Sequence, residues 1–287
     1  MQLHSLNTGF FKLDGGAMFG VVPKSIWNKS NPADVNNLCT WALRCLLIEE
    51  GSRLILVDTG LGNKQDARFF GHYDLAETRA LNLCMQDKGF TTADVTDVFL
   101  THLHFDHCGG AIFREGNRLL PVFPNANYWS NEDHWAWATH PNEREKASFL
   151  SENILPIAES GRLKMINEAS AETEERLATA DFENLFSVRF ANGHTRAMML
   201  PQIIYRGRTI VFMADLLPSA GHLPLPYVMA YDMFPLTTLK EKKIFLEEAL
   251  AGDYILFFEH DPVNECCTLQ RTEKGIRVKE FFRLKDL

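Results

Sequence analysis

Runs of apolar residues alternate with short polar turns along the first sixty residues of the chain. Residues 39–49 and 53–57 form two such runs, and the Gly51-Ser52 pair between them predicts a turn joining two antiparallel strands. The second run ends at Asp58-Thr59-Gly60, so a carboxylate comes directly after a strand.

An amphipathic helix is expected next. Apolar residues recur at helical spacing within residues 75–88, and Gly89 stands where a glycine commonly ends a helix. Residues 95–100 then form a short apolar run, which is typical of a buried strand. The order strand, helix, strand favours an α/β fold.

The C-terminal half repeats this order of elements. Residues 203–205 and 209–214 predict a second hairpin, which ends at Asp215. Residues 239–250 predict a helix, and residues 254–258 predict a strand that ends just before His260. We therefore expect two halves of similar construction that face each other.

The stretch after the strand at residues 95–100 is the richest in metal-binding side chains. Residues 101–110 are Thr-His-Leu-His-Phe-Asp-His-Cys-Gly-Gly. His102 and His104 are two residues apart, and side chains at that spacing point to the same side of an extended chain. Asp106 and His107 come where the chain turns toward the next helix. We expect the first pair to bind one metal ion and the second pair another.

Two metal ions need more ligands than this stretch provides. Ligand sites of α/β sheets gather at the carboxyl ends of strands. Other polar residues directly after apolar strands are Asp58, His194, Asp215 and His260. We expect His194 to complete the first site, His260 the second, and Asp215 to bridge both ions. Asp58 is expected to orient a ligand histidine, or else to cap the following turn.

Imidazole and carboxylate ligands suit two divalent metal ions, for which Zn²⁺ is our prediction and Fe, Mn or Co are alternatives. Zinc lowers the pKa of a bound water to about 7 and so produces a nucleophile at neutral pH. The six cysteines include no C-x-x-C pair and are expected to be buried thiols. A ligand role for Cys108, inside the metal-binding stretch, is the alternative.

No Gly/Ser-rich or Pro-rich linker divides the chain, which predicts a single domain over residues 1–287. Three of the five tryptophans lie within nine residues of the aromatic-rich segment 128–150. This segment is either a helical hairpin whose rings pack on the core or an apolar wall over the metal site. Residues 216–235 are rich in proline and predict a long ordered loop near that site, containing His222 and Tyr231.

Composition narrows the partners. A formal net charge of −8 without clustered Lys and Arg argues against nucleic acid. Hydrophobic content of 46% and charged content of 23% are ordinary for a soluble protein. No apolar stretch reaches the roughly 18 residues that span a membrane, and no signal peptide is visible, so a cytoplasmic location without membrane contact is expected.

Taken together, these residues resemble the metallo-β-lactamase superfamily. The pattern consists of His102-x-His104-x-Asp106-His107, Gly193-His194-Thr195, Asp215 and His260, and the Val57-Asp58-Thr59-Gly60 turn is similar as well. The resemblance implies a four-layer αββα sandwich with the metals at one edge and a bridging hydroxide as nucleophile. It also implies a hydrolase, because a carboxylate in place of His104 marks the oxygen-reducing di-iron branch.

Further stretches resemble the quorum-quenching N-acyl homoserine lactonases and the methyl parathion hydrolase group. They are residues 14–20 (Asp-Gly-Gly-Ala-Met-Phe-Gly), Pro141-Asn142-Glu143-Arg144 and Tyr231-Asp232. Pro218 stands where the small lactonases place a tyrosine, so Tyr231 or His222 is the candidate to replace it. The resemblance implies a small-molecule substrate with a lactone or ester bond, and it allows a homodimer.

Within this interpretation Asp106 and Asp215 are the catalytic carboxylates, and Asp106 is the candidate to carry a proton. Three alternatives remain open. They are an organophosphate or phosphodiester hydrolase on the same site, a di-iron redox protein, and a metal-binding protein without catalytic activity.

Overall fold

The computed structural model of the protein describes residues 1–166, 177–178, 182 and 185–287. Contacts divide the chain into two compact units. Unit 1 comprises Met1–Gly9 and Leu43–Thr173, and unit 2 comprises Phe10–Ala42 and Glu174–Leu287. The single domain over residues 1–287 stays a prediction.

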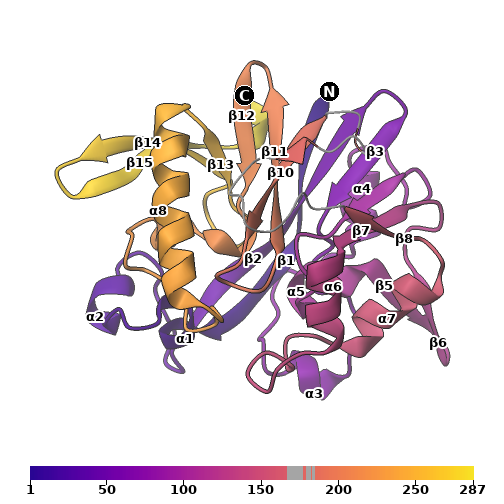
Figure 1. Ribbon diagram of the computed structural model, residues 1–287. Helices are drawn as coiled ribbons and strands as arrows, with labels where there is room; N and C mark the ends of the chain where they lie inside the picture. The colour runs from indigo at the N-terminus through magenta and orange to yellow at the C-terminus, as the bar shows by residue number, and fades with distance from the viewer. Residues whose placement is uncertain (167–176, 179–181, 183–184) are drawn as a thin grey trace. The chain divides into compact units, whose positions relative to one another are not determined.

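A six-stranded mixed sheet has the order β1-β2-β3-β4-β7-β8 (Figure 1). β2 and β3 form the antiparallel hairpin that the sequence predicts, whereas β3, β4, β7 and β8 run parallel. β1 and β2 each contribute residues to both units. The strands are β1 (Gln2–Asp14), β2 (Leu38–Glu50), β3 (Arg53–Val57), β4 (Asp97–Phe99), β7 (Asn127–Asn131) and β8 (Leu163–Ile166).

Short helices and one small hairpin complete unit 1. They are α3 (Ala67–Phe70), α4 (Leu81–Gln86), α5 (Phe105–Cys108), η1 (Gly109–Ala111), α6 (Glu132–Thr139) and α7 (Ser151–Glu159), with β5 (Ile112–Glu115) and β6 (Arg118–Pro121). One apolar core joins side chains of β2, β3, β4, α4 and α7. Because β3 and β4 are parallel and neighbouring, Asp58 and Thr101, which follow them, come to the same edge of the sheet.

Unit 2 contains a seven-stranded mixed sheet, in the order β15-β14-β13-β12-β11-β10-β9. β11 and β12 form the second predicted hairpin, and β12 runs parallel to β13, as β3 does to β4 in unit 1. The strands are β9 (Leu177–Ala178), β10 (Phe186–Ala191), β11 (Met198–Tyr205), β12 (Arg208–Phe212), β13 (Ile255–Phe257), β14 (Cys266–Thr272) and β15 (Gly275–Phe282).

The long helix α8 (Pro235–Ala251) connects β12 to β13 and packs on β14 and β15 (Figure 1). Its buried residues recur every three or four positions, at Thr238, Lys242, Phe245, Leu246 and Ala249, which makes one face of the helix part of the core. Among the described residues, the other helices of unit 2 are α1 (Gly15–Phe19), α2 (Lys24–Trp27), η3 (Ala214–Leu216), η4 (Ala220–His222) and η5 (Leu284–Asp286).

Several predicted elements differ in their bounds, and a helix and a loop show what moves them. The helix expected at residues 75–88 is confined to α4, because Asp74 and Glu77 have positive φ angles of 40° and 50° and keep the preceding residues out of a helix. α8 starts at Pro235, where a proline suits the first helical turn, so the predicted loop 216–235 ends one residue earlier. Within the described residues no helix has the length and apolar character to span a bilayer.

Candidate metal centre

The metal-binding stretch of unit 1 leaves the sheet at the end of β4 and enters α5. His104 is the last extended residue, with φ −64° and ψ 152°, and Asp106 and His107 lie in the short helix α5. All four predicted ligands are buried. His102 Nε2 and His104 Nδ1 lie 3.1 Å apart, so the two imidazoles converge as the sequence predicts.

A hydrogen-bond chain that starts at Asp58 determines which nitrogen of His102 carries the proton. The Asp58 carboxylate accepts from the backbone N–H of Thr101 at 2.8 Å and from the Thr101 hydroxyl at 2.7 Å. A hydroxyl has one proton, so Thr101 Oγ1 must accept from His102 Nδ1, which lies 3.1 Å away. The lone pair of neutral His102 is therefore on Nε2.

Asp58 also holds His107. The His107 Nδ1–H donates to Asp58 Oδ2 at 3.1 Å, and His107 Nε2 lies 3.8 Å from Asp106 Oδ2. Asp58 is fully buried and has a left-handed φ of 55°, directly after β3. Asp58 thus fixes the orientation of the His107 ring, and His107 as a metal ligand stays a prediction.

His104 is held from the opposite side by a residue that the sequence did not single out. Its Nε2–H donates to Glu145 Oε1 at 3.0 Å, so its lone pair is on Nδ1. The second oxygen of Glu145 accepts from the Trp137 indole N–H at 2.7 Å.

Two further residues of the segment 128–150 contact the metal-binding stretch. Phe149 packs against the His104 ring at a centroid distance of 4.7 Å, and His134 Nε2 accepts from the Leu103 backbone N–H. The aromatic segment 128–150 therefore contacts the metal-binding stretch.

In unit 2, His194 follows β10 and lies between two carboxylates. Its Nδ1–H donates to Asp232 Oδ1 at 2.9 Å, and its Nε2 lies 3.1 Å from Asp215 Oδ2. Burial alone would lower the pKa of His194, but the charges and hydrogen bonds of Asp215 and Asp232 outweigh it and raise this pKa to about 10. The surroundings of His194 thus favour a positive charge.

His260 follows β13 and is the last predicted ligand of unit 2. Its Nδ1–H donates to the Ala42 carbonyl at 2.8 Å, which leaves Nε2 at 3.4 Å from Asp215 Oδ1. Asp215, in η3 after β12, therefore faces His194 with one carboxylate oxygen and His260 with the other. This is the arrangement that a bridging carboxylate needs.

His222 and Tyr231, the two candidate substrate residues from the loop 216–235, lie in different surroundings. His222 is buried, its Nε2–H donates to the Met18 carbonyl at 2.9 Å, and its Nδ1 accepts from the Ser219 hydroxyl at 2.9 Å. Burial lowers the pKa of His222 to about 3, so the ring is neutral. This favours a structural role. Tyr231 is 37% exposed.

Cys108 is fully buried and its thiol lies 3.3 Å from the Leu103 carbonyl oxygen, to which it donates. Burial raises the pKa of this thiol to about 12. Because a metal binds the thiolate rather than the thiol, these surroundings disfavour Cys108 as a ligand.

The donor set fits divalent metal ions in both units. Each of the five predicted histidine ligands donates one ring N–H to the protein and turns the other nitrogen toward another predicted ligand. Two such acceptors facing each other repel unless a positive charge lies between them. The separation of 3.1 Å between His102 Nε2 and His104 Nδ1 is close to the value of about 3.3 Å for two nitrogens bound to one tetrahedral zinc.

Sequence reasoning missed Glu145 and the backbone carbonyl of Ala42, and it noted Asp232 only through the Tyr231-Asp232 pair. Glu145 directly follows the Pro141-Asn142-Glu143-Arg144 stretch, which was the only signal near it. A backbone carbonyl leaves no trace in the residue pattern.

Curated relatives and solved structures are similar to this chain. Probable metallo-hydrolases of Mycobacterium tuberculosis and Mycobacterium bovis are each 37% identical over 154 residues, which is 46% of this chain and 45% of the relative. The chain thus matches less than half of their length. A probable metal-dependent hydrolase from Staphylococcus aureus has a TM-score of 0.85 at 26% identity and covers 98% of this chain and 96% of its own.

A dizinc quorum-quenching lactonase, solved with the product N-hexanoyl-L-homoserine, has a TM-score of 0.77 at 21% identity and covers 98% of this chain and 95% of its own. These likenesses confirm the predicted α/β fold class of the metallo-β-lactamase type. The sequence model of the metallo-beta-lactamase superfamily matches residues 44–260, which include every predicted metal ligand. The chain belongs to the metallo-beta-lactamase superfamily.

Proposed function

We propose that the protein is a dinuclear metal-dependent hydrolase that opens a lactone or ester bond, with an N-acyl homoserine lactone-type molecule as substrate. The observation that carries the proposal is the common arrangement of the five histidines. Each has one ring nitrogen held by the protein, by Thr101, Glu145, Asp58, Asp232 or the Ala42 carbonyl, and in our proposal the other ring nitrogen binds the metal ion.

The proposed ligand sets are those predicted from the sequence. His102, His104 and His194 would hold one ion, Asp106, His107 and His260 the other, and Asp215 would bridge them. Two bound divalent ions, Zn²⁺ in this proposal, would supply an activated water and polarise the carbonyl oxygen of the substrate.

The protein's own residues orient the ligands and move the proton. Asp58, Glu145 and Asp232 accept hydrogen bonds from imidazole N–H groups. These bonds make the imidazoles stronger ligands for a metal ion, and the carboxylates balance positive charge in the buried site. The Asp106 side chain is largely buried and keeps 11% of its surface exposed. In our proposal it accepts the proton of the attacking water and delivers it to the leaving oxygen.

Aromatic side chains beside the metal-binding stretch suit an acyl or aromatic substrate. Phe105 lies within that stretch, and its ring contacts Phe69 of α3 at 5.3 Å and Tyr73 at 4.9 Å between centroids. Trp135 and Trp137 instead pack against the core of unit 1. The core-packing interpretation therefore suits these two tryptophans, while Phe149 contacts His104 directly.

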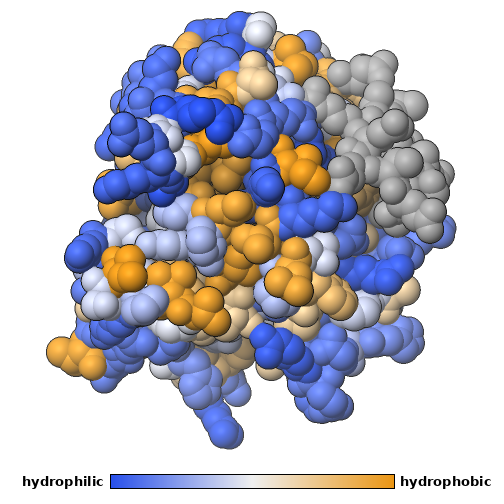
Figure 2. Space-filling model, turned by 60° about the vertical axis from the view of Figure 1, so that its left-hand side comes forward, coloured by the Kyte–Doolittle hydropathy of each residue, from blue (hydrophilic) through white to orange (hydrophobic). Residues whose placement is uncertain are grey.

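The predicted homodimer and cytoplasmic location remain predictions. Unit 2 exposes several large apolar side chains, and Figure 2 shows apolar residues reaching the surface of one face among hydrophilic ones. The most exposed of these large apolar side chains in unit 2 are Val21, Val35, Leu236 and Val263.

The test is a substrate panel on zinc-loaded protein, with metal analysis of the protein as purified. We expect about two metal ions per chain and faster turnover of N-hexanoyl homoserine lactone than of an aryl ester, a thioester or an aryl phosphotriester. A preference for the phosphotriester would favour the alternative hydrolase. Iron with a visible charge-transfer band would favour the redox alternative. Full metal content without turnover of any substrate would contradict an enzymatic role.

The double variant His104→Ala/Asp215→Ala removes one predicted ligand from each unit. It is expected to lose both metal and lactone hydrolysis. Retention of both properties would contradict the proposal, and Glu143→Ala, an exposed carboxylate on the same segment as Glu145, serves as the matched control.

A further inference from the structure

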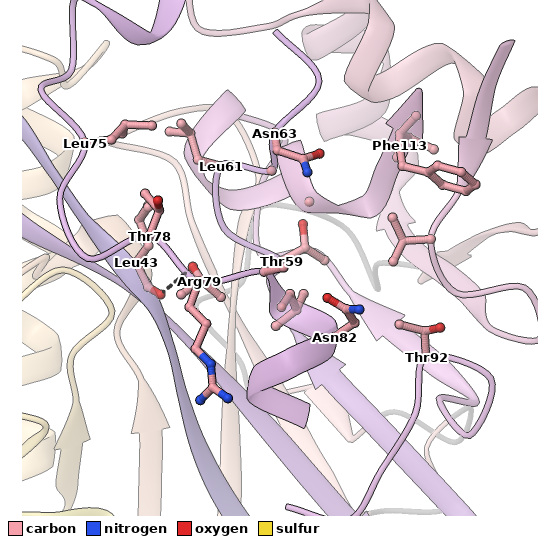
Figure 3. Close-up of a pocket in the computed structure, with 17 residues that line it drawn as sticks. Leu43, Thr59, Leu61, Asn63, Leu75, Thr78, Arg79, Asn82, Thr92 and Phe113 are labelled. Carbon is pink, nitrogen blue, oxygen red and sulfur yellow. Dashed lines mark hydrogen bonds between the residues drawn. The ribbon is translucent and has the colours of Figure 1, made fainter. Parts of the chain in front are cut away.

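Unit 1 contains a pocket of about 530 Å³ outside the predicted ligand set. Its walls come from β1, β2, the residues after β3, α4 and the β5–β6 hairpin (Figure 3). None of the seven predicted metal ligands lines it. The volume lies in the range of about 300–1,000 Å³ that is usual for small-molecule sites.

The floor of this pocket is apolar. Leu43, Leu61, Leu81 and Ile112 line it and are each at most 8% exposed. Aliphatic side chains of this kind form a surface that favours an alkyl chain over a charged group. The pocket therefore offers burial for the apolar part of a ligand.

The polar groups that line the pocket are uncharged, apart from Arg79. The Arg79 guanidinium forms an ion pair with Asp87, and Figure 3 shows its side chain leading away from Leu61 and Leu75. Asn63 and Asn82 offer amide groups that both donate and accept. A neutral amide or ester is the polar group that this lining matches.

The hydroxyl of Thr59 acts only as an acceptor for a ligand, because its proton is already used. Thr59 Oγ1 donates to the His107 carbonyl at 2.9 Å, and the Thr59 backbone N–H donates to the same oxygen at 2.7 Å. Thr59 therefore joins the wall of the pocket to the backbone of a predicted metal ligand.

This wall is packed closely against the end of the metal-binding stretch. The Gly110 N–H donates to the Gly60 carbonyl at 2.9 Å. A Cβ added at Gly109 would lie 2.1 Å from the Leu61 carbonyl oxygen, and one at Gly110 would lie 2.1 Å from that of Thr59. With so little space between the two segments, a displacement of residues 59–62 moves residues 107–110.

We propose that this pocket is a second binding site, separate from the metal ligands, for a neutral molecule with an aliphatic chain and an amide or ester group. Its occupancy is transmitted to His107 through Thr59 and the Gly109-Gly110 backbone. The site does not depend on the proposed hydrolysis, so it also binds in a variant without turnover.

The experiment titrates N-hexylacetamide into the zinc-loaded full chain and follows side-chain methyl and histidine ring signals by NMR. Saturable shifts are expected for the methyl groups of Leu61, Leu81 and Ile112 together with the ring of His107. Hexanoate and hexylammonium, which carry a charge on the same chain, are expected to bind at least about tenfold more weakly.

Two tryptophan variants on the same helix separate pocket binding from binding elsewhere. Asn82→Trp fills the pocket and is expected to weaken N-hexylacetamide binding at least about tenfold, whereas Leu83→Trp, on the neighbouring exposed residue that does not line it, leaves the affinity within about twofold. Equal binding to both variants, equal binding of the charged analogues, or an unshifted His107 ring would overturn the proposal.

The same titration on Asp215→Ala distinguishes this site from the proposed active site. Shifts at Leu61 and Ile112 that persist in this variant support a separate pocket, even if lactone hydrolysis was never present. Shifts that disappear with Asp215 would place the probe among the metal ligands and overturn the inference.

Discussion

Unit 1 presents four predicted ligands within six consecutive residues, whereas the three predicted ligands of unit 2 follow three different strands, β10, β12 and β13. In unit 1 the imidazoles are held by side chains, Thr101, Glu145 and Asp58. In unit 2 one imidazole is held by Asp232 and the other by the Ala42 backbone carbonyl. Unit 1 thus gathers its imidazole and carboxylate side chains through a local motif, whereas unit 2 gathers the same kinds of side chain through the topology of its sheet.

Each unit also places a buried lysine against a loop that supports its ligands. Lys64 donates to the Gly109 carbonyl at the end of the metal-binding stretch. Lys242 of α8 donates to the carbonyls of Pro224 at 2.8 Å and Tyr227 at 2.9 Å, in the loop that leads to Asp232. Burial lowers the pKa of Lys64 to about 8 and that of Lys242 to about 7.

Removing Asp215 is expected to have the largest effect, because this carboxylate faces both histidines of unit 2. Asp215→Ala should reduce lactone hydrolysis by at least about 10²–10³-fold and lower the metal content measured by elemental analysis. Glu273→Ala, on an exposed turn of unit 2, should change neither. Wild-type metal content in Asp215→Ala would show that the local motif of unit 1 is sufficient.

The carboxylates that hold the imidazoles come next. Glu145→Gln leaves one acceptor for two donors, His104 Nε2–H and Trp137 Nε1–H, and Asp232→Asn weakens the acceptor of His194. Each should lower metal affinity about 10–100-fold in a competition with a chelator, with Glu143→Gln as control. An effect of Glu145→Gln without one of Asp232→Asn would mean that only unit 1 depends on its supporting residues.

Lys242→Met tests the buried cation of unit 2 through pH. Burial lowers the pKa of Lys242 to about 7 in the folded protein, whereas its ordinary pKa, which applies to the unfolded chain, is 10.5. The unfolded state therefore binds more protons in this window, and the contribution of Lys242 to stability rises with pH. The slope is at most about 1.4 kcal/mol per pH unit.

The measurement is the difference between wild type and Lys242→Met in the free energy of unfolding, determined with urea from pH 7 to pH 10. This difference should grow with pH in favour of the wild type. The adjacent exposed Lys243→Met should give a flat difference. A flat profile for Lys242→Met as well would contradict a depressed lysine pKa.

His222→Gln is expected to have the smallest effect on catalysis. His222 makes hydrogen bonds with Met18 and Ser219 and stacks on Phe19 at 4.5 Å between centroids, so its loss should cost about 1–3 kcal/mol of stability. Lactone turnover at a temperature where the variant is folded should stay within about twofold of wild type. A fall in kcat with unchanged stability would instead assign His222 to the substrate.

The same contrast explains what the sequence reveals. Parallel strands bury both faces, so β3, β4, β12 and β13 are recognisable in the sequence as apolar runs. The polar residues that follow these runs, Asp58, His102, Asp215 and His260, could therefore be predicted. The imidazole partners Glu145 and Asp232 could not be predicted from the sequence, because their contacts depend on how α6 and α8 pack. The start of α4 was also hidden, because it depends on backbone angles at Asp74 and Glu77 rather than on periodicity.

The hydrogen bond from His260 to the Ala42 carbonyl joins residues 218 positions apart. During synthesis on the ribosome the segment containing Ala42 emerges early and must wait for almost all of the remaining chain before it meets His260. A fragment that begins after residue 42 would contain His194, Asp215 and His260 but would lack the acceptor that sets the ring of His260. The last predicted ligand of the chain is therefore oriented by β2, one of its first strands.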